Sequence, residues 1–258
     1  SNGPLYDWVM GERPGHVSPT LGLDLILGFE AIQQATTAKA AAALITQCHL
    51  PRECVPTQFL ESKEVWAALL ADMPLEAMVR NLGNMGKAEL LTPMSNATAF
   101  VVNRLHDETL IKRARLHPIK VLAALRTYGQ GKGFRGSNQW PVVSQVVDAL
   151  NDAFYLAFKA VEPTNKRIML ALDVSGSMGS PMMNMPYLTC REASAALALV
   201  TANVESNWMI TGFAAGDSPT MRRGYGAAIT PLSISPRQRL DDVIKYTQRH
   251  NFGGTDCA

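Results

Sequence analysis

The chain has 258 residues, of which 47% are hydrophobic and 18% charged, so a sizeable core is possible and global disorder is excluded. The formal net charge is only +2, and this value alone gives no indication of a nucleic-acid partner. The four cysteines form no CxxC pair and no zinc-type spacing, a pattern that favours reduced thiols in the cytoplasm. The alanine-rich run near Ala40 is too short to span a membrane, and neither a signal peptide nor membrane association is expected.

The first part of the sequence is predicted to form short helices separated by frequent turns. The apolar, alanine-rich segment from Leu21 to Thr46 is a strong helix former. Ser62 is a suitable N-cap for the next helix, whose apolar residues share one face. The residues expected in the core of this region are Val65, Trp66, Leu69 and Leu70, together with Trp140.

Proline, aspartate and glycine mark the ends of the following helices. Pro74 stands at the first position of a helix that Gly83 is expected to end. Asp107 can cap another helix, and Pro118 can begin one that closes at Gly129. Because no strand-like alternation interrupts this region, the pattern favours stacked helical pairs, a HEAT-like helical-repeat domain. The expected helices are 74–83, 96–105, 110–116, 118–128 and about 141–160.

The sequence changes in character after residue 165. Ile168–Leu172 is a continuous apolar run typical of a buried parallel strand, and Trp208–Phe213 is a second strand. The alternation of strand and helix predicts a parallel sheet covered by helices. The fold class is therefore α + α/β, with a helical-repeat domain over residues 1–165 and a Rossmann-like domain over 166–258. The helices expected in the second domain are Glu192–Asn203 and a segment that is capped by Ser235, begins at Pro236 and reaches about Arg249.

Oxygen-bearing side chains follow the first predicted strand at intervals of two residues: Asp173, Ser175 and Ser177. Sites in open α/β sheets form at the carboxyl ends of strands, and hard cations prefer oxygen ligands. Thr255 and Asp256, in a Gly-Gly-Thr-Asp segment, can return to the same sheet edge and assist. The pattern predicts a divalent-cation site for Mg²⁺, with Mn²⁺ or Ca²⁺ as alternatives, although a capped turn is a simpler interpretation of the first three residues.

Positive charge is concentrated between Arg104 and Arg135, where eight basic residues face only two acidic ones. Such an asymmetry indicates a basic surface that could contact RNA phosphates, although a solvated face would look the same. Lys112 and Arg115 are three residues apart and are expected to share a helical face. The candidate RNA-binding residues are Lys112, Arg113, Arg115, His117, Lys120, Arg126, Lys132 and Arg135.

Several blocks of the chain resemble one protein family. Residues 173–178 and 253–257 resemble the metal-ion-dependent adhesion site of von Willebrand A domains, and the other blocks resemble the TROVE module of the Ro autoantigen family. The TROVE-like blocks are Glu64–Leu70, Met73–Gly83, Ala114–Pro118 and Val161–Arg167.

The resemblance implies a ring of helical repeats closed by a von Willebrand A domain. It also implies an RNA-binding protein without enzymatic activity, which binds small noncoding Y-like RNAs and the single-stranded ends of misfolded RNA in RNA quality control. Compared with the family, the helical domain is expected to lack its N-terminal part and the A domain to be truncated. A monomer is expected. Two alternatives are a metal-dependent adhesion module that captures an acidic residue of a protein partner, and an accessory subunit of an ATP-driven complex.

Overall fold

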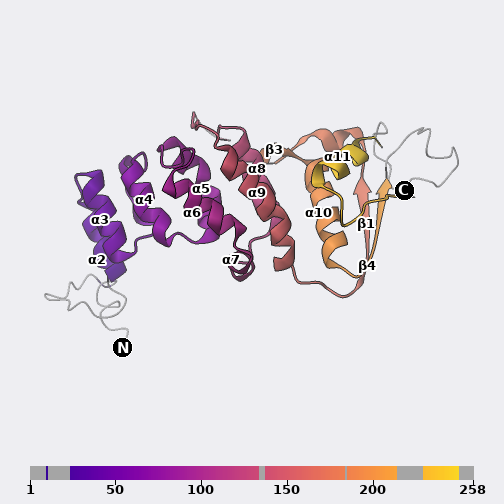
Figure 1. Cartoon of the computed structure of the whole chain (residues 1–258), viewed down its shortest axis with the longest axis horizontal. Helices are drawn as coiled ribbons and strands as arrows, with labels where there is room; N and C mark the ends of the chain where they lie inside the picture. Colours follow the sequence, from indigo (N-terminus) through magenta and orange to yellow (C-terminus); the bar gives the residue numbers. More distant parts are fainter. Residues whose placement is uncertain (1–9, 11–23, 134–136, 184, 214–228, 250–258) are drawn as a thin grey trace. The chain divides into compact units, whose positions relative to one another are not determined.

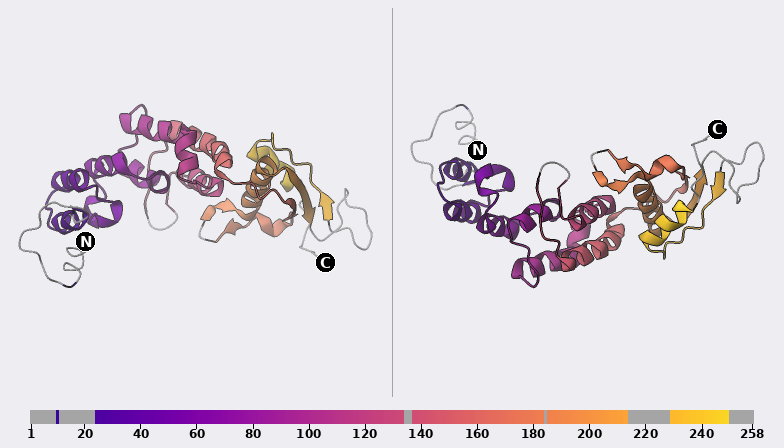
Figure 2. Two further views of the ribbon diagram at one scale, coloured as in Figure 1. Left: turned by 90° about the horizontal axis from the view of Figure 1, so that it is seen from below. Right: turned by 90° about the horizontal axis from the view of Figure 1, so that it is seen from above.

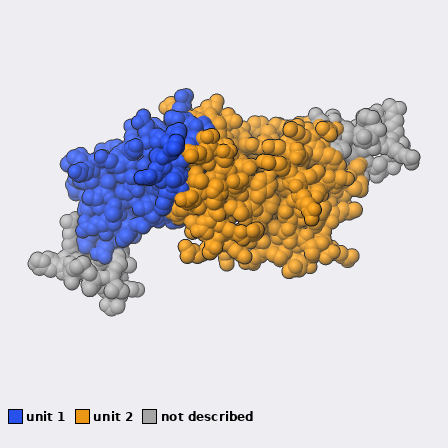
Figure 3. All heavy atoms as spheres, in the orientation of Figure 1, with its two compact units in different colours: residues 1–100, 138–143 blue, residues 101–137, 144–258 orange. Residues whose placement is uncertain are grey.

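The computed structural model describes residue 10 and residues 24–133, 137–183, 185–213 and 229–249 (Figure 1). The chain divides into two compact units, coloured separately in Figure 3. Unit 1 comprises residues 1–100 and 138–143, and unit 2 comprises residues 101–137 and 144–258. The boundary predicted at residue 165 lies inside unit 2, so the last helices of the helical segment belong to the same compact unit as the sheet.

Unit 1 is built from helices that pack side by side (Figures 1 and 2). The segment expected as one helix over 21–46 contains two, α2 (Asp24–Gln33) and α3 (Ala38–Cys48). The break arises because Thr37 is an N-cap, with its side chain accepting a hydrogen bond from the Ala40 N–H at 3.2 Å. The remaining elements of this unit are η1 (Arg52–Cys54), η2 (Thr57–Phe59), α4 (Lys63–Asp72), α5 (Leu75–Lys87) and the first turn of α6 (Asn96–His106).

Helix α4 confirms the predicted cap and the predicted buried face. The Ser62 hydroxyl accepts a hydrogen bond from the Val65 N–H at 3.5 Å. Trp66 is only 1% exposed, and its indole N–H donates to the Leu60 carbonyl at 2.8 Å. Both the apolar ring and the polar edge of Trp66 are therefore satisfied inside the unit. Val65, Leu69 and Leu70 are buried with it.

The sequence pattern predicted that helix α5 ends at Gly83, but the helix continues to Lys87. A Cβ atom added to Gly83 would lie 2.8 Å from the ring of Trp140, and one added to Gly86 would lie 3.0 Å from the Cβ of Trp140. Because these glycines have no side chain, the indole of Trp140 packs directly against the helix backbone. Gly83 therefore serves close packing and not helix termination.

Unit 2 contains the rest of α6, from residue 101 onward, and the last helices of the helical segment. These are α7 (Glu108–Arg113), α8 (Pro118–Gly129), α9 (Ser144–Leu156) and η3 (Ala157–Ala160). The predicted cap of α7 is confirmed, since Asp107 Oδ1 accepts from the Leu110 N–H at 2.9 Å. Pro118 occupies the first turn of α8, as expected. The Phe154 ring packs edge-on against Phe158 at a centroid distance of 5.0 Å, which joins α9 to η3.

The sheet of unit 2 has the strand order β1-β4-β5. β1 (Arg167–Asp173) and β4 (Asn207–Phe213) are parallel, which confirms the predicted pairing, and helix α10 (Cys190–Val204) connects them. The predicted burial of the first strand is wrong, because the residues of β1 are exposed or half-buried, with Met169 57% exposed. Two features were not predicted: β5 (Ile229–Pro231) is antiparallel to β4, and β2 (Pro181–Met182) forms a hairpin with β3 (Met185–Thr189).

The last described helix, α11 (Leu240–Gln248), begins four residues later than the predicted start at Pro236. Ser235 and the residues after it form a turn instead, in which the Ser235 N–H donates to Gln238 Oε1 at 2.9 Å. The serine and proline therefore mark a turn and not the first helical turn. Within the described ranges, no helix combines the length and apolarity that a membrane span requires.

The linker between the helical segment and β1 is held by Glu205, which is 8% exposed. Its carboxylate accepts hydrogen bonds from the backbone N–H groups of Thr164 at 2.7 Å and Asn165 at 3.2 Å. These bonds, the one from Thr164 first, lower the pKa of Glu205 below its usual range. The negative charge of Glu205 therefore stabilises this connection.

Replacing Glu205 with glutamine is expected to lower the unfolding midpoint at neutral pH. A carboxyl group whose pKa is depressed on folding stabilises the protein above its unfolded pKa of about 4.3, and this contribution is lost as the pH falls through the folded pKa. The difference between parent and Glu205→Gln should therefore shrink as the pH is lowered below about 4. Thermal unfolding measured between pH 3 and 7 tests this; a difference that does not change with pH would show that the charge has no role.

Candidate metal site and basic surface

The loop at the carboxyl end of β1 brings three of the five predicted metal ligands together. Asp173 is the last residue of β1 and pairs in register with Phe213 of β4. The next residue, Val174, is 1% exposed and donates its N–H to the Phe213 carbonyl at 3.0 Å. The chain then turns through the short 3-10 helix η4 (Gly176–Gly179). The buried Val174 and its bond to β4 therefore fix the start of the loop, and the oxygen-bearing side chains follow at the end of the strand.

Short hydrogen bonds hold these side chains close to one another. Asp173 Oδ1 accepts from the Ser175 N–H at 2.8 Å, and the hydroxyl oxygens of Ser175 and Ser177 are 2.9 Å apart. One carboxylate and two hydroxyls suit a hard cation that retains several waters, as Mg²⁺ does. Among the described residues, no three or more histidine, cysteine or acidic side chains are grouped as a metal site would require. That part of the chain therefore contains no zinc-type cluster that would compete with the loop as a metal site. Thr255 and Asp256 lie outside the described residues.

The structure also reveals a residue that sequence reasoning missed at this loop. Arg191, in the first turn of α10, is 9% exposed, and its Nη2 donates to the Ser175 carbonyl at 2.8 Å. Nothing in the sequence marked this arginine, because its partner is a backbone carbonyl 16 residues away. The next residue, Glu192, forms a capping box with Thr189, which the Thr-x-x-Glu spacing could have predicted.

Five of the predicted RNA-binding residues are exposed on unit 2, in α7, in α8 and in the segments that follow these helices. They are Lys112, Arg113, Arg115, Lys120 and Lys132. Arg135 lies outside the described residues. His117 is also exposed, but its Nδ1 caps α8 by accepting from the Ile119 N–H at 3.2 Å. The exposed residues lie on consecutive elements of unit 2.

Two details differ from the prediction for this basic surface. Lys112 and Arg115 do not share a helical face, because α7 ends at Arg113 and Arg115 follows with a positive φ of 49°. Arg126 is 29% exposed and already engaged, with its Nε 3.1 Å from Glu192 Oε1 and its Nη2 3.5 Å from Asp241 Oδ1. The contact with Glu192 has the distance of an ion pair but not the geometry of a hydrogen bond. Arg126 could contact a phosphate only by giving up these carboxylates.

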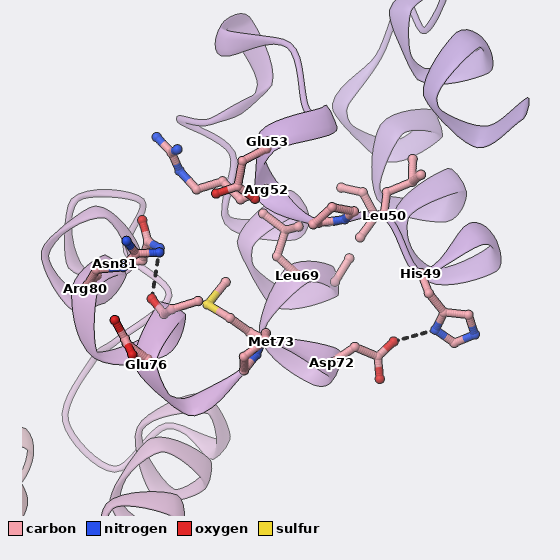
Figure 4. Close-up of a pocket in the computed structure, with 15 residues that line it drawn as sticks. His49, Leu50, Arg52, Glu53, Leu69, Asp72, Met73, Glu76, Arg80 and Asn81 are labelled. Atoms are coloured by element: carbon pink, nitrogen blue, oxygen red, sulfur yellow. Dashed lines mark hydrogen bonds and ion pairs between the residues drawn. The ribbon is translucent and has the colours of Figure 1, made fainter. Parts of the chain in front are cut away.

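Unit 1 contains a cavity of about 510 Å³ beside α3, α4 and α5 (Figure 4). Its apolar lining includes Leu50, Leu69 and Met73, and its edge carries charges of both signs. His49 Nδ1 lies 2.7 Å from Asp72 Oδ2 at this edge. The balance of charge offers a phosphate no clear advantage, so the basic surface of unit 2 is the stronger candidate for RNA. The charged side chains of the lining are Arg52, Glu53, Asp72, Glu76 and Arg80.

Two family models match separate parts of the chain. The TROVE domain matches residues 47–127, and the Ro60 vWA domain matches residues 167–258. The first lies in the helical segment, and the second begins at β1 and includes the candidate metal loop, residues 173–179. The class of protein is therefore a helical TROVE domain joined to a von Willebrand A domain.

Comparison with individual proteins gives the same result. The RNA-binding protein RO60 of Deinococcus radiodurans is 40% identical over 259 residues, which are 100% of this chain and 46% of that protein. The RNA-binding protein RO60 of Caenorhabditis elegans is 34% identical over 237 residues, which are 92% of this chain and 34% of that protein. The crystal structure of the Deinococcus radiodurans Ro (RSR) protein superimposes with a TM-score of 0.82, covering 98% of this chain and 48% of that one.

The chain belongs to the Ro family. It spans less than half the length of these curated relatives, so the fold described above is a part of the arrangement that they contain.

Proposed function

We propose that this chain is part of a Ro-type RNA-binding protein that uses its basic surface to contact RNA phosphates and has no catalytic activity of its own. Its ligands would be small noncoding, Y-like RNAs and the single-stranded ends of misfolded RNAs, in RNA quality control. The observation that carries the proposal is the group of five exposed basic residues on consecutive elements of unit 2. The two curated relatives, both named RNA-binding proteins, support it.

The chemistry of this surface favours affinity without sequence selectivity. Lysine and arginine side chains that neutralise phosphates release counterions, and this contribution is independent of the bases. Arg115 adds a further argument, because a non-glycine residue with positive φ costs about 1 kcal/mol. Glycine would relieve that cost, so an arginine at this helix end suggests that its charge has a use.

The metal loop supports a second activity on the same chain. A divalent cation, Mg²⁺ first, would be bound by Asp173, Ser175 and Ser177, with Thr255 and Asp256 as further ligands. With water molecules completing its coordination, the cation would supply an electrophilic point for the carboxylate of a protein partner. This adhesion function is compatible with RNA binding, because the candidate residues of the two activities are different.

The pair of substitutions Lys112→Ala and Arg115→Gly tests the RNA proposal. Each removes one charge, and Arg115→Gly also relieves an unfavourable backbone conformation, so a loss of affinity could not be attributed to unfolding. We expect both variants, and more strongly the double variant, to bind all single-stranded RNA sequences more weakly. The measurement is fluorescence anisotropy with several labelled oligonucleotides on the intact protein.

A matched control is Lys166→Ala, which removes the same charge as Lys112→Ala from another exposed position of unit 2. It should retain the parental affinity. A Lys112→Ala and Arg115→Gly double variant with parental affinity would contradict the proposed location of the site. Loss of affinity for only one sequence would contradict the proposed contact with phosphates.

A further inference from the structure

A chain of polar contacts within unit 2 leads from helix α8 to the metal loop. It ends at Arg191, whose guanidinium donates to the Ser175 carbonyl at 2.8 Å. A Cβ on Gly179 would be 4.0 Å from Nη1 of the same guanidinium, so Arg191 lies near both ends of the loop turn. Its Nε has no hydrogen-bond partner in the described part of the chain. The first turn of α10 places Arg191, and Arg191 in turn holds the backbone between Ser175 and Ser177.

Glu192 fixes that first turn. One carboxylate oxygen, Oε2, accepts hydrogen bonds from the Thr189 N–H at 2.9 Å and from the Thr189 hydroxyl at 3.0 Å. The Thr189 hydroxyl in turn accepts from the Glu192 N–H at 3.1 Å, which completes the capping box. The other oxygen, Oε1, faces Arg126 of helix α8. One carboxylate thus caps α10 and also meets a positive charge from the helical segment.

Arg126 joins the helical segment to two helices of the A domain. Its Nε is 3.1 Å from Glu192 Oε1 on α10, and its Nη2 donates to Asp241 Oδ1 on α11 at 3.5 Å. The side chains of Arg126 and Glu192 are 29% and 19% exposed, so this pair is partly shielded from water. A charge pair of this kind depends less on salt than one on an open surface.

We propose that Arg126 is a positioning residue for the metal site. It holds Glu192, Glu192 holds the first turn of α10, and Arg191 on that turn holds the Ser175 carbonyl between Asp173 and Ser177. The inference rests on the proposed metal site and assigns Arg126 a role other than contact with RNA. Residues that hold metal ligands in place without contacting the metal often lower the metal affinity by about 10-fold or more when they are replaced.

The test measures Mn²⁺ and Mg²⁺ affinity of the intact protein by calorimetry, with Mn²⁺ binding also followed by electron paramagnetic resonance. We expect Arg126→Met to weaken binding by about 10-fold and Arg126→Lys, which retains the charge, to recover part of the loss. Glu192→Gln should weaken binding similarly, and the double variant Arg126→Met with Glu192→Gln should be no weaker than the more affected single variant. Such non-additivity is the signature of residues that act through one contact.

Arg237→Met is the matched control, because it removes an arginine from an exposed position of the same unit. It should bind metal with parental affinity. If the parent binds no divalent cation, both the metal site and this inference are overturned. If Asp173→Ala abolishes binding while Arg126→Met and Glu192→Gln bind as the parent does, the inference alone is overturned. Should Arg126→Met fail to fold, Arg126→Lys and Glu192→Gln carry the test, since the first retains the positive charge and the second preserves the size of the side chain.

Discussion

Replacing Asp173 with alanine is expected to abolish binding of Mg²⁺ and Mn²⁺. Asp173 supplies the only carboxylate among the three candidate ligands that the structure describes, and neutral hydroxyls alone hold a hard divalent cation poorly. The substitution also removes the acceptor of the 2.8 Å hydrogen bond from the Ser175 N–H, so the loop loses its anchor. The fold should persist, because β1 pairs with β4 through backbone groups that the substitution leaves in place.

Calorimetric titration of the intact protein with each cation measures this effect. Asp148→Ala provides the control, since it removes an exposed carboxylate from helix α9 in the same unit and should leave the affinity unchanged. An Asp173→Ala variant that binds Mg²⁺ as tightly as the parent would place the metal site elsewhere.

Replacing Trp66 with alanine should destabilise unit 1 by about 3–5 kcal/mol, which is the usual cost of emptying a buried tryptophan site. Trp66 is 1% exposed, and its loss also removes the indole N–H that donates to the Leu60 carbonyl at 2.8 Å. Trp66→Phe keeps most of the apolar volume and should cost clearly less. The measurement is urea unfolding followed by circular dichroism. A loss below about 1 kcal/mol in Trp66→Ala would show that helix α4 is packed differently.

The helices could be predicted where local chemistry determines them. The caps Ser62 and Asp107 and the first-turn Pro118 act within a few residues, so their patterns located α4, α7 and α8. Gly83 misled the prediction because the reason for that glycine is Trp140, more than 50 residues away in sequence. Helix α11 was misplaced for a related reason: the Ser-Pro pair serves a turn as well as it serves a helix start.

In the candidate site, too, local features could be predicted from the sequence and long-range contacts could not. The proximity of Asp173, Ser175 and Ser177 was predictable because these residues are close in sequence and follow a strand whose apolar run is easily recognised. The contacts of Arg126 with α10 and α11 join residues that are 66 and 115 positions apart in the sequence, so they depend on how the helices pack together. No local pattern indicates such packing. Arg115 was placed wrongly because α7 ends two residues before it, and helix ends are the least certain feature of a sequence-based assignment.

The measurement that tests the central claim most directly is a salt titration of the affinity of the intact protein for single-stranded RNA. If about four of the exposed basic residues contact phosphates, the logarithm of the association constant should fall with the logarithm of the salt concentration with a slope near −3. The Lys112→Ala and Arg115→Gly double variant should reduce that slope by roughly 1.4 in magnitude. A double variant with the parental slope would contradict the account, because these charges would then be only a solvated face of the protein.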